Sequence, residues 1–352
     1  MAKLFFSCHC SRQLRGAALR ASRLNAFVPC FAANNAPLYP NTWSEKYFSA
    51  STRPSKSLGR LQKTTCMVTG ASSGIGFAIT QRMLLEGADK VILVSRSEER
   101  LNSALERLGE IVPSRPVKKE DAAKAQKEES ATTESKRWGG FASKSQVHLS
   151  VNDRVSLVIG DVGNPSFWSE DVKKVMNQVD ILVNAAGVSH TSLLPFAKDE
   201  AISDMLNTNL RGTIFACRAM ASRVLRKPSS RGNGDSKCII NISSLHAVKG
   251  GIGAATYAST KAGVIALTRA IVAEAAASRH SVRLRANVIV PGYIETKMLD
   301  ELSPQIREEA RLSVPLQRFG TSEEVADAAL FLATNQYANN CVLNLDGGLS
   351  AL

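Results

Sequence analysis

Short runs of β-branched and aliphatic residues alternate with longer amphipathic segments from residue 64 onward. The runs are largely apolar throughout instead of alternating with polar residues, which is typical of strands buried on both faces of a parallel sheet. They predict strands at residues 64–69, 90–95, 155–160, 180–184, 237–242, 285–290 and 341–345. The segments between them predict helices near residues 74–87, 97–109, 165–178, 199–226, 256–279 and 321–334.

This alternation predicts one α/β domain at residues 61–352. Connections between parallel strands are right-handed, so helices cover both faces of the sheet. The predicted fold is therefore a Rossmann-type, doubly wound sheet of seven parallel strands. No apolar run approaches the roughly 18 residues of a membrane-spanning helix. The seven cysteines have neither zinc-site spacing nor a disulfide framework, so we expect no metal.

Residues 113–150 interrupt the alternation. They are rich in charged residues, Ser and Thr and poor in branched apolar residues, so they cannot bury enough surface to offset the entropy of ordering. A segment of this length inside a compact domain is usually functional or disordered. The sequence predicts a disordered surface insertion, with a partner-docking element as the alternative.

Positive charge is concentrated before the predicted domain. The 352-residue chain carries a net charge of +13, and residues 1–63 hold ten bases and a single acid, Glu45. Residues 1–60 combine Arg, Ser and Ala with scattered apolar residues but no continuous apolar core, which is typical of an organellar transit peptide. We expect a mitochondrial leader and a location in the matrix, with a disordered basic tail as the alternative. Because this segment explains most of the charge, no nucleic-acid partner is expected.

A glycine-rich turn follows the first predicted strand. Its spacing is G-x-x-x-G-x-G, and a helical pattern comes directly after it. Glycines at such a turn let the backbone approach a pyrophosphate, which the free N–H groups at the helix start then bind. A turn without a ligand is the alternative, but the strand–turn–helix context favours a dinucleotide site. That site would include Gly70, Ser72, Ser73, Gly74, Ile75 and Gly76.

The second predicted strand ends in Ser95 and Arg96, twenty residues after Gly76. An acid at this place binds the ribose hydroxyls of NAD, whereas an arginine accommodates the 2′-phosphate of NADP. Arg96 therefore predicts NADP as the cofactor, with a solvated arginine in a surface turn as the alternative. Glu98 and Glu99 are expected to begin the next helix.

Two further strand ends lie where ligands of open α/β sheets bind. Asp161 and Val162 follow the third predicted strand, and Asp161 would accept a hydrogen bond from the adenine amino group or cap the local turn. The fourth predicted strand ends in an Asn-Ala-Ala-Gly loop. We expect this loop to line the cofactor through Asn184, Ala185 and Gly187.

Ser244, Tyr257 and Lys261 form the most specific chemical pattern. Tyr257 and Lys261 are four residues apart in a helical segment, so their side chains share one face. A tyrosine with a pKa of about 10 is a poor acid–base catalyst at neutral pH. A neighbouring ammonium favours the phenolate and lowers that pKa. Ser244, at the end of the fifth predicted strand, is placed to hydrogen-bond a substrate carbonyl.

These motifs, in this order and at these strand ends, resemble the short-chain dehydrogenase/reductase family over residues 64–352. The resemblance implies a Rossmann fold and hydride transfer from a nicotinamide to a carbonyl. Tyr257 would be the general acid, Ser244 would position the substrate oxygen, and Lys261 would hold the nicotinamide ribose and lower the tyrosine pKa. Asn209 would hold a proton-relay water, with Asn207 as the near alternative. The nicotinamide carboxamide would be covered by Pro291, Gly292, Ile294 and Thr296.

Within that family the chain is most similar to the 3-oxoacyl-[acyl carrier protein] reductases, on residues 184–187, 291–298, 314–333 and 346–348. This similarity implies NADPH-dependent reduction of a 3-oxoacyl thioester to the (3R)-hydroxyacyl product in mitochondrial fatty acid synthesis. The partners would be acyl carrier protein and, in a homotetramer, further copies of the chain. The nearest alternative is another carbonyl or alcohol substrate, such as a quinone, a steroid or an acyl-CoA. A more distant alternative is a scaffold protein that binds a nucleotide but does not catalyse a reaction.

Two features of the sequence bear on partners and cofactor. Four basic residues lie near the end of a predicted helix: Arg218, Arg223, Arg226 and Lys227. They would contact an acidic carrier protein, with an ordinary solvated helix end as the alternative. The chain also departs from the family in the insertion at residues 113–150, in the irregular segment 279–287 and at the positions that follow. Ser72 and Ser73 stand where many NADP enzymes have a base, and Asn340 stands where the family usually has Gly.

Overall fold

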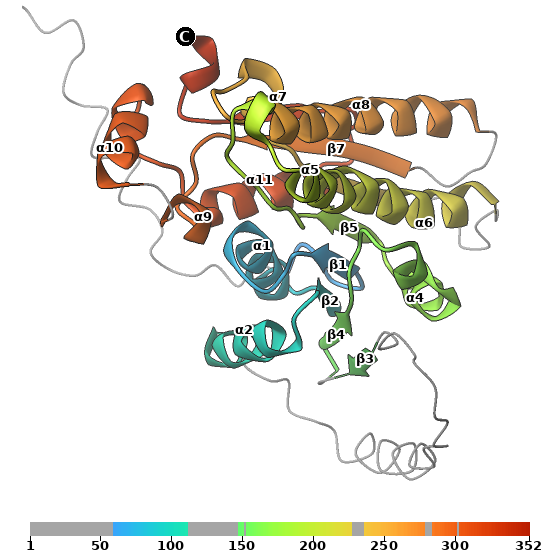
Figure 1. Ribbon diagram of the computed structural model, residues 1–352. Coiled ribbons are helices and arrows are strands. Elements are labelled where there is room, and N and C mark those ends of the chain that lie inside the picture. The colour runs from blue at the N-terminus through green and yellow to red at the C-terminus, as the bar shows by residue number, and fades with distance from the viewer. Residues whose placement is uncertain (1–58, 112–146, 151–152, 227–235, 279–283, 301–302) are drawn as a thin grey trace, which may run out of the picture. The chain divides into compact units, whose positions relative to one another are not determined.

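The structure, a computed structural model, describes residues 59–111, 147–150, 153–226, 236–278, 284–300 and 303–352 (Figure 1). The chain divides into two units, Met1–Ser55 and Lys56–Leu352, and all described residues fall in the second. The predicted leader lies outside the described residues except for Gly59 and Arg60. Arg60 pairs with Glu86 at 2.7 Å, so these last two residues belong to the folded part.

The described residues contain an eight-stranded sheet of order β3-β4-β2-β1-β5-β6-β7-β8. Seven of its strands are parallel to one another, which confirms the predicted Rossmann-type arrangement. They are β1 (Thr65–Thr69), β2 (Lys90–Ser95), β4 (Val155–Ile159), β5 (Ile181–Asn184), β6 (Lys237–Ile242), β7 (Leu284–Pro291) and β8 (Val342–Leu345). The strand order reverses between β1 and β5, which is the switch point where such sheets bind ligands.

The eighth strand, β3 (Val147–Ser150), pairs antiparallel with β4 at one edge of the sheet. Its four residues are the end of the segment predicted to be disordered, so that prediction is wrong for them. Apolar Val147 and Leu149 alternate with polar residues, as in a strand at a sheet edge, but four residues were too short a signal to outweigh the charged segment before them. The rest of the predicted insertion lies outside the described residues.

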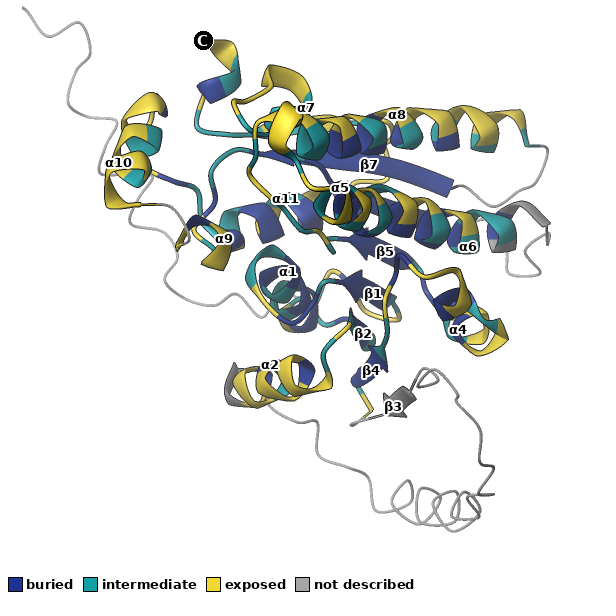
Figure 2. Cartoon of the chain, viewed as in Figure 1, coloured by how far each residue is buried: buried dark blue, intermediate teal, exposed yellow. Residues whose placement is uncertain are grey.

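Helices cover both faces of the sheet, because alternate side chains of each strand point to opposite sides. Cys66 and Val68 pack with α1 (Gly74–Leu85), α2 (Glu98–Ile111) and α11 (Ser322–Thr334). Met67, between them, packs in a second core with α4 (Glu170–Met176), α6 (Gly212–Arg226) and α8 (Ala255–Ala277). Figure 2 shows the result: the central strands β1, β2, β5, β6 and β7 are buried, whereas β8 at one edge of the sheet is partly exposed.

Some helices differ from the prediction. The predicted helix at 199–226 is interrupted, with α5 (Asp199–Met205), a π-helical segment (Leu206–Arg211) and then α6. The one at 165–178 begins as a 3-10 helix (Pro165–Trp168) and continues as α4. Short helices without a sequence signal are α7 (His246–Lys249), α9 (Lys297–Asp300) and α10 (Pro304–Ser313), with 3-10 turns at Leu194–Phe196 and Leu349–Ala351.

As expected, Glu98 and Glu99 begin α2. Asn340, which stands where the family usually has Gly, has a φ of +60°, a conformation that asparagine adopts more readily than most residues. In the described part of the chain, no helix combines the length and apolar character needed to cross a membrane.

Candidate active site

Ser244, Tyr257 and Lys261 come together at the carboxyl end of β6. Lys261 lies on α8, with its Nζ atom 5.7 Å from the centre of the Tyr257 ring. Lys261 Nζ donates a hydrogen bond to the carbonyl oxygen of Ile242 at 3.0 Å. Ser243 Oγ donates to the Lys261 carbonyl at 2.8 Å, which holds the start of α8 against the strand end. The structure therefore assembles the three residues that the sequence predicts.

Burial controls the acid–base properties of this group. It lowers the pKa of Lys261, which is 5% exposed, to about 8. It also raises the pKa of Tyr257, and a hydrogen bond with Ser244 opposes that rise. On balance the pKa of Tyr257 is therefore raised, where the sequence predicted a lowered value, because removal of the phenol from water dominates in this structure. The phenol is protonated at neutral pH, which is the form a general acid needs.

Asn209 connects the loop after β5 to α8. Its Oδ1 accepts from Val188 N at 2.8 Å, and its Nδ2 donates to Val188 O at 2.9 Å and to Thr260 Oγ1 at 3.2 Å. Its side chain is fully buried. Asn207 is placed differently, with its carbonyl against Gly163. Asn209 therefore lies beside Thr260, the residue that precedes Lys261.

The glycine turn packs directly on the loop after β5. Gly70 and Gly74 have positive φ angles of +68° and +53°. A Cβ atom on Gly70 would lie 2.8 Å from Ala186, and one on Gly76 would lie 2.3 Å from the Gly70 carbonyl oxygen. Only glycine fits these two positions without backbone movement.

The start of α1 has the properties of an anion site. Ser73 precedes the helix but makes no capping hydrogen bond, and the first turn contains no acid. The free N–H groups of this first turn therefore have no side-chain acceptor, and the helix dipole would favour a phosphate at this point. Ile75 lies within this first turn.

The predicted adenosine-side residues are close to the turn. Ser72 Oγ and Ser95 Oγ are 3.2 Å apart, which joins the turn to the end of β2. Arg96 is half-exposed, and its Nη1 lies 3.8 Å from Asp204 Oδ1 on α5. Asp161 Oδ1 accepts from Gly163 N at 2.9 Å, so the capping role given as its alternative is present.

Two of the predicted cofactor residues direct their side chains into the protein core. Val162 is buried. Asn184 Nδ2 donates to Asn241 Oδ1 at 2.8 Å on the neighbouring strand. Any contact of these residues with a nucleotide is thus made by their backbone. Beside Asn184, Ala185 and Gly187 continue the loop, and a Cβ on Gly187 would lie 3.3 Å from Lys261 Nζ.

The segment predicted to cover the nicotinamide lies against both parts of the site. Pro291 O accepts from Leu245 N at 2.8 Å, next to Ser244. Gly292 N donates to the carbonyl of Leu345, and Ile294 is buried. Thr296 lies at the far end, with its Cγ2 3.3 Å from where a Cβ on Gly74 would stand. Residues 291–296 therefore extend from the neighbourhood of Ser244 to the glycine turn.

Comparison with known proteins agrees with this geometry. Residues 64–141 match the family model described as short chain dehydrogenase, and residues 142–350 match the one described as enoyl-(acyl carrier protein) reductase. The chain belongs to the short-chain dehydrogenase/reductase family. It is thus an NAD(P)-dependent oxidoreductase, as the motifs predicted.

Similar members of the short-chain dehydrogenase/reductase family are known from bacteria and mammals. A 3-oxoacyl-[acyl-carrier-protein] reductase of Chlamydia trachomatis is 32% identical over 294 residues, covering 83% of this chain and 99% of the relative. One of Rattus norvegicus is 32% identical over 284 residues, covering 81% and 97%. A solved structure described as a short chain dehydrogenase/reductase family protein has a TM-score of 0.62 at 26% identity, covering 83% of this chain and all of that one.

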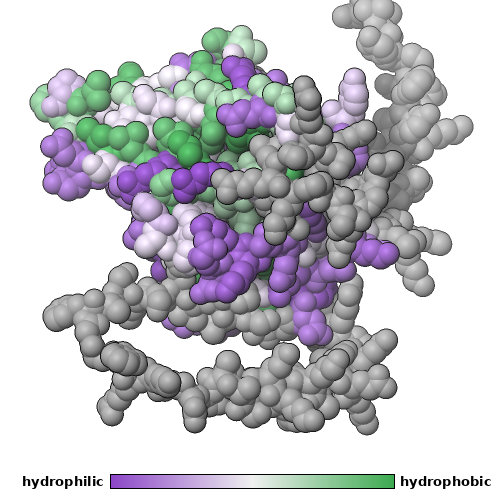
Figure 3. Space-filling view, turned by 90° about the vertical axis from the view of Figure 1, so that its right-hand side faces the viewer, coloured by the Kyte–Doolittle hydropathy of each residue, from purple (hydrophilic) through white to green (hydrophobic). Residues whose placement is uncertain are grey.

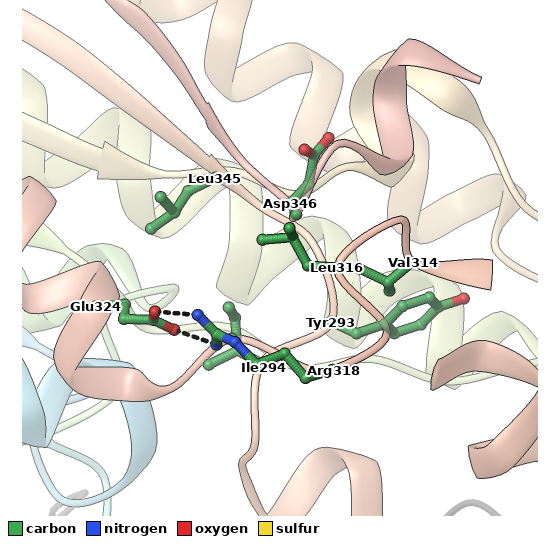
Figure 4. Close-up of a pocket in the computed structure, with 10 residues that line it drawn as sticks. Tyr293, Ile294, Val314, Leu316, Arg318, Glu324, Leu345 and Asp346 are labelled. Carbon is green, nitrogen blue, oxygen red and sulfur yellow. Dashed lines mark hydrogen bonds and ion pairs between the residues drawn. The ribbon is translucent and has the colours of Figure 1, made fainter. Parts of the chain in front are cut away.

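A small cavity of about 90 Å³ lies behind the 291–296 segment (Figure 4). Tyr293, Leu345 and Asp346 line it, as do Arg318 and Glu324, which form a two-point ion pair at 2.6 and 2.9 Å. This pair lowers the pKa of Glu324 to about 2. The cavity contains none of the predicted catalytic residues and is too small for a dinucleotide.

Three residues of the site carried no sequence signal. Thr260 receives the Asn209 amide, Asp204 pairs with Arg96, and Arg107 on α2 reaches the glycine turn. Each acts through a contact between elements far apart in the chain, which local spacing does not reveal. Among the described residues, no group of three His, Cys, Asp or Glu side chains is arranged to hold a metal ion.

Proposed function

We propose that the protein reduces 3-oxoacyl thioesters of acyl carrier protein to (3R)-3-hydroxyacyl thioesters, with NADPH, in the mitochondrial matrix. The observation that carries this proposal is the position of Ser244, Tyr257 and Lys261 beside the glycine turn and the 291–296 segment. The relatives named as 3-oxoacyl-[acyl-carrier-protein] reductases support the substrate class.

The residues present fit a dinucleotide. The uncapped start of α1 suits a pyrophosphate, and Gly187 leaves open the space between Lys261 and Asn209. The adenosine would contact Asp161, Val162 and Arg96, and the nicotinamide ribose would contact Tyr257 and Lys261. The remaining lining would be Gly70, Ser72, Ser73, Gly74, Ile75, Gly76, Asn184, Ala185, Gly187, Pro291, Gly292, Ile294 and Thr296.

A bound nicotinamide supplies hydride to the carbonyl carbon of the substrate. The Tyr257 hydroxyl donates its proton to the carbonyl oxygen as negative charge develops there. Ser244 donates a hydrogen bond to the same oxygen and fixes its position. The Lys261 ammonium stabilises the phenolate that remains on Tyr257. Asn209, through Val188 and Thr260, keeps the cofactor loop in register with α8 and would hold a water that returns a proton to the tyrosine.

An apolar surface beside the site suits an acyl chain. Phe196 and Ile252 are 76% and 93% exposed, and Leu193 and Leu194 are exposed nearby in the chain. The two loops that carry them are joined by a hydrogen bond from Ser192 N to Gly253 O at 3.0 Å. Exposed apolar residues gathered in this way usually mark a binding surface.

Other parts of the proposal rest on surface composition. Arg218, stacked on Phe215, would meet an acidic carrier protein. The side chains of Arg223 and Arg226, like residue Lys227, lie outside the described part.

In Figure 3 apolar residues gather in the upper half, at the level of α8, whose exposed positions include several alanines. The small exposed side chains would let this helix pack closely on a second copy in the proposed homotetramer. The composition of residues 1–60 supports mitochondrial import.

A substrate comparison tests this proposal. The purified protein is given NADPH with acetoacetyl thioesters of carrier protein and of coenzyme A, and separately with a quinone or a ketosteroid. We expect carrier-protein thioesters to give the highest kcat/KM. Failure to oxidise NADPH with any 3-oxoacyl thioester would overturn the proposal, and activity on a quinone or steroid would then favour the alternative. A fluorescent reporter carrying residues 1–60 tests import into mitochondria.

A further inference from the structure

Arg107 lies in the second half of α2 and reaches back to the glycine turn. Its Nη2 donates to the carbonyl oxygen of Ser72 at 2.8 Å, and its Nε donates to the carbonyl of Ser103 at 3.4 Å. Its guanidinium carbon lies 3.9 Å from the centre of the Phe77 ring, on the first turns of α1. A guanidinium is planar and stacks well on an aromatic face, so these contacts fix both its position and its plane.

The charge of Arg107 is not neutralised by an acid. In the part of the chain that the structure describes, no carboxylate lies within ion-pair distance of its guanidinium. Arg96, the cation predicted to bind the 2′-phosphate, differs in this respect because Asp204 lies 3.8 Å from it. A guanidinium carries five N–H donors, and the contacts described leave several of them available.

The surroundings of Arg107 suit a phosphate. Ser72, whose carbonyl it binds, also contacts Ser95 through its hydroxyl at 3.2 Å, and Arg96 follows Ser95 directly. The pair of hydroxyls thus lies at the junction of the turn and β2, with Arg107 bound to the Ser72 carbonyl and Arg96 next to Ser95 in the chain. The turn itself offers no base, since Ser72 and Ser73 occupy the positions where many NADP enzymes have one.

We propose that Arg107 is a specificity-determining residue that supplies a second positive charge for the 2′-phosphate of NADPH. Arg107, although it lies on α2, would take the place of the basic residue that the glycine turn lacks. Guanidinium groups bind phosphate through paired, charge-assisted hydrogen bonds, which adds both affinity and selectivity. This inference rests on the proposed use of NADPH.

The test separates the 2′-phosphate from the rest of the nucleotide. Adenosine 2′,5′-bisphosphate and 5′-AMP are titrated calorimetrically into the wild type, Arg107→Gln, Arg107→Lys and Arg100→Gln. Arg100 is the matched control, because its substitution removes the same charge from an exposed position of the same helix. We expect Arg107→Gln to weaken the bisphosphate by about tenfold or more and to leave 5′-AMP unchanged. Arg107→Lys should recover part of the loss, and Arg100→Gln should change neither ligand.

Several outcomes would overturn the inference. Equal weakening of both ligands in Arg107→Gln would show that Arg107 only positions the turn, and no weakening would show no role at all. Equal loss in Arg100→Gln would show a general effect of charge on α2. These results leave NADPH use intact if the wild type still prefers the bisphosphate. A wild type that binds both ligands equally would instead reject the proposed NADPH preference together with this role of Arg107.

Discussion

The ammonium nitrogen of Lys261 lies 5.7 Å from the centre of the Tyr257 ring and hydrogen-bonds the carbonyl of Ile242. The two residues therefore lie close together in a buried part of the site. Burial keeps the Tyr257 phenol protonated at neutral pH. The phenol is therefore expected to lose its proton only when a substrate oxygen is present to accept it. The predictions below test this arrangement and its supports.

Tyr257→Phe removes only the hydroxyl, so kcat should fall by about two to four orders of magnitude, the usual contribution of a general acid. The cofactor affinity should change little, because the ring and its packing remain. Turnover and NADPH binding are measured on the same preparation. The control is Tyr337→Phe, at a side chain that is 98% exposed. Retained turnover in Tyr257→Phe would remove the tyrosine from the mechanism.

Lys261 should leave a signature in the pH dependence of stability. Its folded-state pKa of about 8 lies below the ordinary value of 10.5, so the unfolded chain binds more protons between these pH values. Stability from this residue therefore rises with pH across that window. The free energy of unfolding of the wild type, minus that of Lys261→Met, should increase by up to about 3 kcal/mol from pH 8 to 10.5. Urea unfolding at several pH values measures it, and a difference that stays flat would contradict the burial of a charged amine.

The seven parallel strands could be predicted because each is an apolar run that needs no partner to be identified. The edge strand Val147–Ser150 could not, since its four residues follow a long charged segment. Tyr257 and Lys261 were predictable because their helical spacing occurs together with a glycine turn and with Ser244 at a strand end. Their pKa values were not: the sequence shows which charges are near one another but not how far each is removed from water, and burial decided the direction for both.

The glycine turn offers a comparison of two glycines. Gly76→Ala would place a Cβ atom 2.3 Å from the Gly70 carbonyl oxygen, a backbone atom that cannot move without distorting the turn. We expect a loss of about 1–3 kcal/mol in unfolding free energy and weaker cofactor binding. Gly109→Ala, on α2 with no atom within 4 Å of the added Cβ, should instead stabilise by about 0.5–1 kcal/mol. Chemical unfolding of both variants decides it, and Gly76→Ala unfolding at the same denaturant concentration as the wild type would show that the turn can adapt.

Asp204 should limit the affinity for NADPH. Its Oδ1 lies 3.8 Å from Arg96 Nη1, and its Oδ2 lies 3.2 Å from His190 Nε2. A carboxylate here competes with a 2′-phosphate for Arg96 and repels it. Asp204→Asn keeps an oxygen acceptor for His190 but removes the charge. Because the pair is substantially exposed, we expect a modest gain, about two- to fivefold tighter NADPH binding, that shrinks as salt is added.

The matching control for Asp204 is Asp199→Asn, which removes the same charge from the first turn of the same helix. NADPH and NADH dissociation constants are measured for both variants by quenching of protein fluorescence. A gain confined to NADPH in Asp204→Asn identifies competition for Arg96, since NADH has no 2′-phosphate to benefit. Two outcomes would contradict this prediction: an equal gain in NADH affinity, or the same gain in Asp199→Asn. Either result would mean that Asp204 acts only through the overall charge of α5 and does not compete with the 2′-phosphate for Arg96.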